Sequence, residues 1–230
     1  MATTAAGGMN RFYLVLAAVV VIGLAALGYS ALRPSPVSIP ANVTVVAADT
    51  AGFRGYLLGS ESAPVEVTDY ADFQCPACGT FEAVQFPDIQ SRLIATGRVR
   101  WRYRDFPLNQ HQHSRLAAHA AACADDQGKY WPMHRFLYEG QSDWAEASDR
   151  AATDEIRGYA RSAGVDLGKY DACMSSAKHA GRIQASLDEG EKIGVNSTPT
   201  LLIAGRLYPG VMTYDNLRHL VDSLAPPSKP

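Results

Sequence analysis

The longest apolar stretch of the chain runs from residue 12 to residue 32. Its sequence, FYLVLAAVVVIGLAALGYSAL, contains no charged residue, and at 1.5 Å per residue a helix of this length crosses a ~30 Å hydrocarbon core. A cleaved signal peptide usually has an apolar region of only ~7–15 residues, and the small-residue cleavage pattern after this stretch is poor. The pattern therefore favours an uncleaved transmembrane anchor at 12–32, after a short cytoplasmic N-terminus at 1–11, over a signal peptide.

Prolines dominate the segment that follows. Three prolines lie between residues 33 and 40, and proline lacks the N–H donor that sheet pairing needs. Residues 33–58 are therefore predicted to form an extended spacer, in which the β-branched run Val43–Val46 predicts an additional strand. The proline-rich end at 225–230 is expected to be a frayed tail.

The next elements follow from the periodicity of apolar positions. Val65–Tyr70 and Val99–Phe106 alternate apolar and polar residues over most of their length, which predicts two strands. Between them, Thr80–Ile94 carries apolar residues at helical spacing, and Pro87 is expected to kink that helix. About 160 residues suit one hydrophobic core, so residues 59–224 are predicted to form a single domain.

A long helical region and a hairpin complete the domain. From Ser114 to about Ile193 apolar residues recur at helical spacing, with Thr153 as the expected cap of a helix that Gly164 ends. Residues 200–208 predict a β-hairpin with glycine in its turn, and Tyr214–Leu224 predicts a closing helix. The order of elements indicates an α/β fold whose strands are interrupted by one large helical block.

Composition and charge narrow the functional classes. The 230-residue chain is 47% hydrophobic and 19% charged, which excludes collagen-like, coiled-coil, disordered and multi-span membrane proteins. After residue 33 the chain holds 19 basic and 23 acidic residues. This net negative charge gives no electrostatic footprint for nucleic-acid binding.

A Cys-Pro-Ala-Cys segment at residues 75–78 lies between the first predicted strand and the helix after it. A cysteine at a helix N-terminus faces unpaired N–H groups and the positive end of the macrodipole, which stabilise a thiolate. Cys75 is therefore the expected nucleophile, and Cys78, one turn later, the resolving cysteine. Pro76 suits the first helical position because no partner awaits its N–H there.

Zinc sites use the same cysteine spacing and are the alternative. Cys123, Cys173 or histidines would have to complete a tetrahedral site, but Cys123 and Cys173 are too far apart to form a second such motif. The strand-to-helix position favours redox chemistry. His111, His113 and His119 could suggest a metal cluster, but the first two lie on a polar connection without a carboxylate at ligand spacing, so no metal is expected.

Taken together, the motifs resemble the thioredoxin superfamily, and specifically its DsbA-like branch. The pattern Asp-x-x-Asp-Phe-x-Cys-Pro-x-Cys occupies residues 69–78, and Gly-Val-x-x-Thr-Pro-Thr occupies residues 194–200. The resemblance covers roughly residues 59–224 and implies a thioredoxin fold with a helical insertion at about 112–176. Within that branch the chain is most similar to membrane-anchored or lipid-anchored bacterial proteins that carry a second cysteine pair.

The resemblance also implies roles for individual residues. Pro199 is expected to follow a cis peptide bond beside the redox pair, because proline alone makes that isomer readily accessible. Thr198 would present backbone groups to an extended substrate. Asp69 matches a buried acid that exchanges protons with Cys78, with a purely structural role as the alternative. Glu82 matches a further acid of the family, although its helix position favours a solvated side chain.

The chain departs from the best-known oxidase pattern at two positions. Ala77 stands where that pattern has a histidine, and Thr198 stands where it has a valine. Without the imidazolium, one charge that stabilises the thiolate is missing, so a less extreme oxidant is expected.

Two cysteines remain outside the Cys-Pro-Ala-Cys segment. All four cysteines follow the apolar stretch, an arrangement that an oxidising compartment permits. With Cys75 and Cys78 matched, Cys123 and Cys173 are expected to form a structural disulfide. Two buried free cysteines, or a redox relay that feeds Cys75, are the alternatives.

The resemblance implies a thiol-disulfide oxidoreductase without a cofactor, on the outer side of the cytoplasmic membrane. Its most direct activity is an oxidase that introduces disulfides into exported proteins and is reoxidised by a quinone-linked membrane partner of the DsbB or vitamin K epoxide reductase type. A reductase or isomerase is one alternative, although no dimerisation domain precedes the catalytic one. A non-catalytic peptide-binding module is another, which the intact Cys75, Cys78 and Pro199 disfavour.

Overall fold

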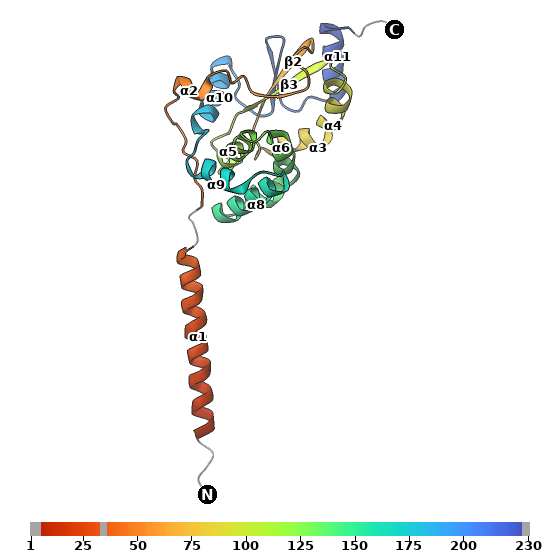
Figure 1. Cartoon of the computed structure of the whole chain (residues 1–230). Coiled ribbons are helices and arrows are strands. Elements are labelled where there is room, and N and C mark those ends of the chain that lie inside the picture. Colours follow the sequence, from red (N-terminus) through yellow and green to blue (C-terminus); the bar gives the residue numbers. More distant parts are fainter. Residues whose placement is uncertain (1–5, 33–35, 227–230) are drawn as a thin grey trace. The chain divides into compact units, whose positions relative to one another are not determined.

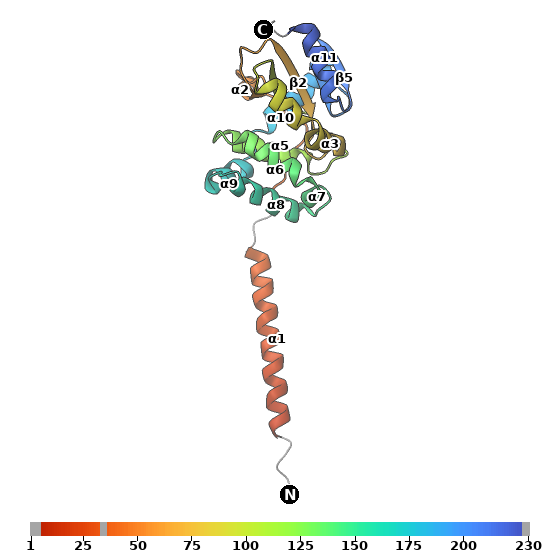
Figure 2. The same ribbon diagram turned by 90° about the vertical axis from the view of Figure 1, so that its right-hand side faces the viewer.

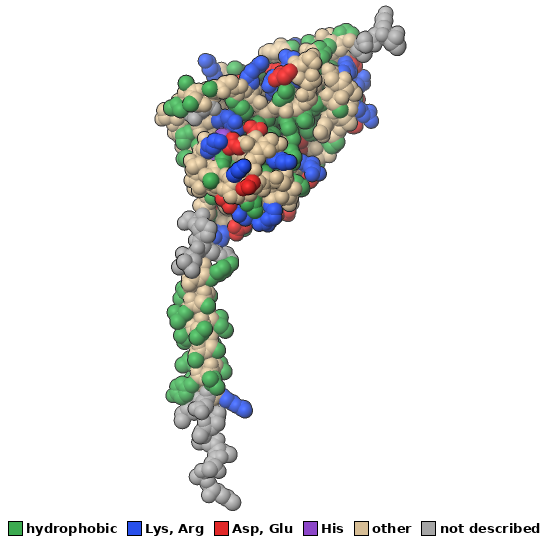
Figure 3. Space-filling model, viewed as in Figure 1, with side chains coloured by type: hydrophobic (Ala, Val, Ile, Leu, Met, Phe, Trp, Pro, Cys, Tyr) green, Lys and Arg blue, Asp and Glu red, His purple; other side chains and the backbone are tan. Residues whose placement is uncertain are grey.

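The computed structural model describes residues 6–32 and 36–226, which divide into two units, Met1–Pro36 and Val37–Pro230. The first unit contains one helix, α1 (Ala6–Leu32). Its residues Arg11–Ser30 are long and apolar enough to cross a membrane, a criterion that an N-terminal signal sequence also meets. Apolar side chains follow one another along the face of α1 in Figure 3. Parts of three predicted segments lie outside the described residues. They are residues 1–5 of the N-terminus, residues 33–35 of the spacer and residues 227–230 of the tail.

A five-stranded mixed sheet with the strand order β1-β3-β2-β4-β5 forms the centre of the second unit (Figure 1). β2 and β3 run parallel, with Val67 opposite Trp101, whereas the other neighbours are antiparallel. The alternating segments predicted from the sequence are confirmed as the two central strands. The strands are β1 (Tyr56–Leu58), β2 (Val65–Ala71), β3 (Val99–Asp105), β4 (Thr200–Ile203) and β5 (Arg206–Pro209).

The additional strand expected at Val43–Val46 is wrong. That segment has no regular structure and is followed by the short helix α2 (Ala47–Thr50), while the edge strand forms at β1 instead. The physical reason is burial: Val46 is largely exposed, whereas Tyr56 is buried and stacks on Tyr130 with ring centroids 3.5 Å apart. β-branched residues favour a strand only where a packed surface receives them.

The helix that follows the cysteine motif is interrupted near Pro87, where a kink was predicted. α3 (Pro76–Val84) begins four residues earlier than expected, and α4 (Phe86–Ile89) continues into a π-helical turn, η1 (Gln90–Ile94). The interruption falls at Gln85, two residues before Pro87, whose missing N–H and bulky ring disturb a helix interior. The early start places the cysteine motif at the first turn of α3.

Six helices lie between β3 and β4, and Figures 1 and 2 both show α5, α6, α8 and α9 gathered together beyond the sheet. Their bounds are α5 (Ser114–Asp125), α6 (Tyr130–Glu139), α7 (Gln141–Trp144), α8 (Asp149–Ser162), α9 (Leu167–Ser175) and α10 (Ala180–Ile193). The cap expected at Thr153 is wrong, because the extended Ser148 caps α8 and Thr153 lies inside that helix. Gly164, with φ of +76°, ends it as expected.

The closing hairpin and helix are confirmed. β4 and β5 pair antiparallel around a turn in which Gly205 has φ of +78°, and α11 (Tyr214–Leu224) begins after Thr213, whose side chain accepts from the Asn216 N–H.

Two main apolar clusters fill the interior of this unit. One lies between the sheet and helices α3, α4 and α11, around Phe81 and Trp101. The other fills the helical region and extends to the cysteine motif, so that it contains Cys75, Cys78 and Tyr103. The motif therefore lies where the helices of the β3–β4 connection pack against the sheet.

Candidate active site

The cysteine motif lies at the junction of β2 and α3. Cys75 is the N-cap residue of α3 in an extended conformation, and Pro76 occupies the first turn. The Cys75 N–H donates to the Asp72 carbonyl at 3.0 Å, and the Gly79 N–H donates to the Cys75 carbonyl at 3.0 Å. Cys75 and Cys78 are free thiols, so the structure represents the reduced form of the pair.

The two thiols have opposite acidities. A hydrogen bond from the Cys78 thiol and the backbone N–H groups of Cys78 and Ala77 lower the pKa of Cys75 to about 5, against the opposing effect of burial. Burial raises the pKa of Cys78 well above its usual value, and the hydrogen bond and charge of Cys75 raise it further. At neutral pH Cys75 is therefore a thiolate and Cys78 a thiol, which is the expected division between nucleophile and resolving cysteine.

The segment before β4 contacts the nucleophile Cys75. The Thr198–Pro199 peptide bond is cis, as expected from the resemblance. The Cys75 Sγ lies 3.4 Å from the Thr198 carbonyl oxygen. This contact brings residues 123 positions apart to one site.

Asp69 lies on β2, the central strand, next to Tyr103 on β3 and Leu201 on β4. Its side chain is buried, and within the described part of the chain neither carboxyl oxygen has a hydrogen-bond partner. Burial raises the pKa of Asp69 to about 8. The charge of Asp69 also raises the pKa of Cys78, so the acid and the resolving thiol interact.

The expectation of a solvated Glu82 is wrong. Its side chain is only 10% exposed, and its Oε1 lies 3.6 Å from His134 Nε2. Burial raises the pKa of Glu82 well above its usual value, with the charge of Asp69 as a second cause, and burial lowers the pKa of His134 to about 3. Burial thus disfavours the charged form of both groups.

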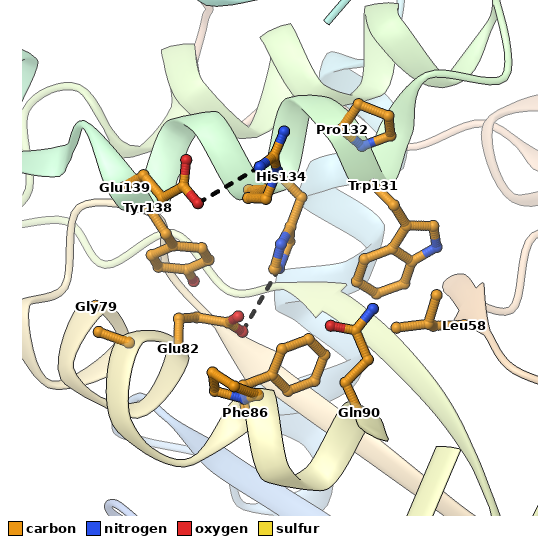
Figure 4. A pocket seen from close by; sticks show the side chains of 13 residues that line it. Leu58, Gly79, Glu82, Phe86, Gln90, Trp131, Pro132, His134, Tyr138 and Glu139 are labelled. Carbon is orange, nitrogen blue, oxygen red and sulfur yellow. Dashed lines mark ion pairs between the residues drawn. The ribbon is translucent and has the colours of Figure 1, made fainter. Parts of the chain in front are cut away.

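Glu82 and His134 face a cavity of about 600 Å³ between α3, α4 and α6 (Figure 4). The aromatic side chains of Phe86, Trp131 and Tyr138 surround the two polar groups. Among the described residues, Glu82 Oε1 and His134 Nε2 have no hydrogen-bond partner. The cavity is therefore large and polar enough at these two groups to hold water.

Asp72 is the second aspartate of the pattern at residues 69–78, and the sequence predicted no role for it. Its buried carboxylate accepts hydrogen bonds from the N–H of Gln74 at 2.8 Å and of Leu108 at 2.9 Å. It also accepts from the Ser114 hydroxyl at 2.5 Å and contacts His111 Nδ1 at 2.7 Å. Asp72 thus ties the motif to the connection between β3 and α5. No local pattern signals the contacts of this carboxylate with Leu108, His111 and Ser114, which lie 36 to 42 residues away.

Cys123 and Cys173 form a disulfide between α5 and α9, with their Cα atoms 5.8 Å apart. The expected pairing is confirmed, and two buried free cysteines are excluded. Zinc binds thiolates, so these two sulfurs are also unavailable to complete a zinc site with Cys75 and Cys78.

Comparisons with known proteins agree with this geometry. The family model described as Thioredoxin matches residues 54–223. Disulfide bond formation protein D of Bacillus subtilis is 26% identical over 176 residues, which cover 72% of this chain and 75% of that protein. The Na(+)/H(+) antiporter NhaA 3 of Salinispora tropica is 33% identical over 171 residues, 74% of this chain, and the chain spans only 24% of that relative's length.

Among solved structures, alpha-DsbA1 of Wolbachia pipientis superimposes with a TM-score of 0.66 at 21% sequence identity. The match covers 74% of this chain and 90% of that protein. It shows a shared fold.

Proposed function

Since the chain belongs to the DsbA-like branch of the thioredoxin superfamily, we propose that it is an oxidase that introduces disulfide bonds into exported proteins. The observation that carries this proposal is the unequal pair at the start of α3, a thiolate at Cys75 and a protonated thiol at Cys78. A stabilised thiolate makes the reduced form more stable and the disulfide form a stronger oxidant.

The proposed reaction is two successive exchanges. A substrate thiolate attacks Sγ of Cys75 in the disulfide form, the Cys75–Cys78 bond breaks, and Cys78 leaves and takes up a proton. A second substrate thiolate then attacks the substrate sulfur of the mixed disulfide and releases Cys75 as a thiolate. Two electrons pass from the two substrate thiols to the pair; one proton stays on Cys78 and the other enters solvent.

Three further residues have proposed roles in these steps. The backbone of Thr198, beside the cis Pro199, pairs with an extended substrate segment and gives affinity with little sequence selectivity. Asp69 supplies and receives the proton of Cys78, because an acid with a pKa near 8 exchanges protons readily at neutral pH. Glu82, which faces the cavity, assists Asp69 in this proton exchange.

The remaining proposals concern location and partner. We propose that α1 anchors the protein and that the folded unit works on the extracytoplasmic side, where the Cys123–Cys173 disulfide is stable. Each turnover leaves the pair reduced, so a membrane oxidant must restore it. A quinone-linked partner of the DsbB or vitamin K epoxide reductase type supplies the required chemistry.

One equilibrium tests the proposed function. The full-length protein in detergent is equilibrated with glutathione buffers, and the state of Cys75 and Cys78 is read by alkylation and mass spectrometry. An oxidase without the motif histidine should have a potential between about −180 and about −120 mV. A potential of about −270 mV would instead identify the protein as a reductase. Cys75→Ser, which cannot form the disulfide, gives the baseline.

A further inference from the structure

Side chains of the types that bind metals gather around the disulfide between α5 and α9. Cys123 lies in α5, and Asp126 is the C-cap residue of that helix, one turn later. Cys173 lies in α9, and His179 is the N-cap residue of α10. The ligand atoms of Asp126, Cys173 and His179 lie within 4.8 Å of one another, and Cys123 joins them through its bond to Cys173. Two cysteines, a histidine and an aspartate, all of them zinc ligands, therefore converge at one place.

The separations of these groups suit a tetrahedral ion. Bonds of ~2.3 Å to sulfur and ~2.0–2.1 Å to nitrogen and oxygen place two sulfurs about 3.8 Å apart and a nitrogen and an oxygen about 3.3 Å apart. His179 Nε2 lies 3.0 Å from Asp126 Oδ2, close to the second separation. The Cα atoms of Cys123 and Cys173 are 5.8 Å apart, so two reduced side chains can reach the first separation by rotation about their Cα–Cβ bonds.

His119 is placed to support a thiolate at Cys123. The His179 N–H donates to His119 Nε2 at 3.0 Å, so Nε2 carries no proton and the imidazole proton lies on Nδ1. That nitrogen lies 3.5 Å from Cys123 Sγ and 3.3 Å from Met174 Sδ. His119 therefore directs an N–H donor toward the sulfur, the arrangement by which neighbouring groups orient metal ligands.

A pocket at the surface gives an ion access to this cluster. Cys123, Cys173 and Asp126 line it together with Lys178, and the Lys178 ammonium lies 2.8 Å from Asp126 Oδ2. Two thiolates, one carboxylate and Zn²⁺ sum to a single negative charge, which this ammonium offsets. The pocket thus provides both an entry path and a balancing charge.

We propose that the reduced chain binds one Zn²⁺ ion through Cys123, Cys173, His179 and Asp126, in place of the disulfide. Every newly made chain carries both cysteines as thiols, because only oxidation joins them. On binding, the two thiols release their protons to solvent, the His179 proton moves from Nε2 to Nδ1, and no electron is transferred. The ion and the disulfide exclude each other, since both use the same two sulfurs. The inference is independent of the redox role of Cys75.

The first test measures the metal content of full-length protein in detergent. The variant Cys75→Ser/Cys78→Ser, which lacks the other two thiols, is reduced with dithiothreitol, freed of reductant without oxygen, loaded with ZnCl₂ and dialysed. The reduced protein should retain one Zn²⁺ per chain by elemental mass spectrometry, and its disulfide form none. Co²⁺ in place of Zn²⁺ should give the thiolate charge-transfer absorption and intense d–d bands of tetrahedral coordination. A reduced protein that retains no zinc, or equal retention by both forms, would overturn the proposal.

The second test identifies the ligands through competition with a chromophoric chelator. His179→Gln and Asp126→Asn, made in the same variant, should each weaken zinc binding by more than about a hundredfold, the largest loss typical of a residue that only supports a ligand. His119→Leu should weaken it by roughly ten- to a hundredfold. His219→Gln, at an exposed position on α11, is the matched control and should leave the affinity unchanged. Circular dichroism of each variant in its disulfide form checks the fold without metal, and undiminished zinc affinity in either His179→Gln or Asp126→Asn would refute the ligand set.

Discussion

The two cysteine pairs of this protein differ in chemistry although all four side chains are buried. The exposed fractions are 6% for Cys75, 1% for Cys78, 1% for Cys123 and 7% for Cys173, so exposure does not separate a reactive pair from an inert one. Cys75 lies at a helix N-terminus among N–H donors and beside the Thr198 carbonyl. Cys123 and Cys173 lie within helices, where the backbone N–H groups are already paired along the helix. Reactivity here follows from the hydrogen bond between Cys78 and Cys75 and from the backbone N–H groups at a helix terminus.

The largest effect is expected when a substitution removes one cysteine of the reactive pair. Cys75→Ser should abolish disulfide exchange with a dithiol peptide, because the remaining Cys78 is buried and its pKa is raised. Cys78→Ser should instead retain the nucleophile, so that its Cys75 thiolate attacks a peptide that contains a disulfide, displaces one peptide thiolate and accumulates the mixed disulfide, which mass spectrometry detects. Equal activity in both variants would remove the distinction between nucleophile and resolving cysteine.

The second prediction removes the other pair. Replacing Cys123 and Cys173 together by Ala opens a connection of 50 residues, which by chain entropy costs about 4 kcal/mol at most. The melting temperature should fall by roughly 10 °C, measured by circular dichroism. The potential of the Cys75–Cys78 pair should not change, and a shift of that potential would support a redox relay between the pairs.

The third prediction concerns the buried acid beneath the reactive pair. Asp69→Asn removes the proton carrier of Cys78 and should slow formation of the mixed disulfide, the step in which Cys78 leaves and takes up a proton, by about a hundredfold. Stopped-flow fluorescence at several pH values measures the step. Rates that match wild type across the pH range would leave Asp69 with a structural role only.

The same variant has a signature in stability. The folded pKa of Asp69 is about 8 against about 3.9 in an unfolded chain, so between these values the folded state binds a proton that the unfolded state lacks. The free energy of unfolding therefore falls as pH rises, by at most about 1.4 kcal/mol per pH unit from this group. In Asp69→Asn this part of the slope should be absent from urea unfolding series.

The smallest effect is expected at Glu82, which acts on the Cys78 thiol only through Asp69. Glu82→Gln alters a residue that interacts with Asp69 and faces the cavity, so formation of the mixed disulfide should slow only about two- to threefold, well below a direct proton donor's contribution. Glu139→Gln, at an exposed position on the same cavity, is the control. A slowing as large as that of Asp69→Asn would mean that Glu82 contacts the proton path directly.

Local patterns predicted much of the fold and the centre of the site. The central strands, the closing hairpin, the break near Pro87 and the cysteine motif all depend on neighbours in sequence, and the thioredoxin fold that the resemblance implied is confirmed. The Thr198–Pro199 segment could be assigned to the site because its motif is as specific as the first one.

The errors arose where long-range packing decides. Glu82 has a helix position that periodicity alone makes solvent-facing, but α6 brings His134 against it. Asp72 and His111 are 39 residues apart, and nothing in either local sequence announces their contact. Val43–Val46 has strand propensity, but Val46 is largely exposed and the segment forms no strand.

The disulfide between α5 and α9 also has a bearing on how the protein is produced. Closing it from two thiols removes two electrons and two protons from each newly made copy. In a reducing cytoplasm the Cys75–Cys78 pair has the reduced state described here, but Cys123 and Cys173 also remain thiols and do not form their disulfide. Material expressed there would carry a complete reaction centre on an uncross-linked scaffold, and only secretion or oxidative refolding would yield the covalent structure of the native chain.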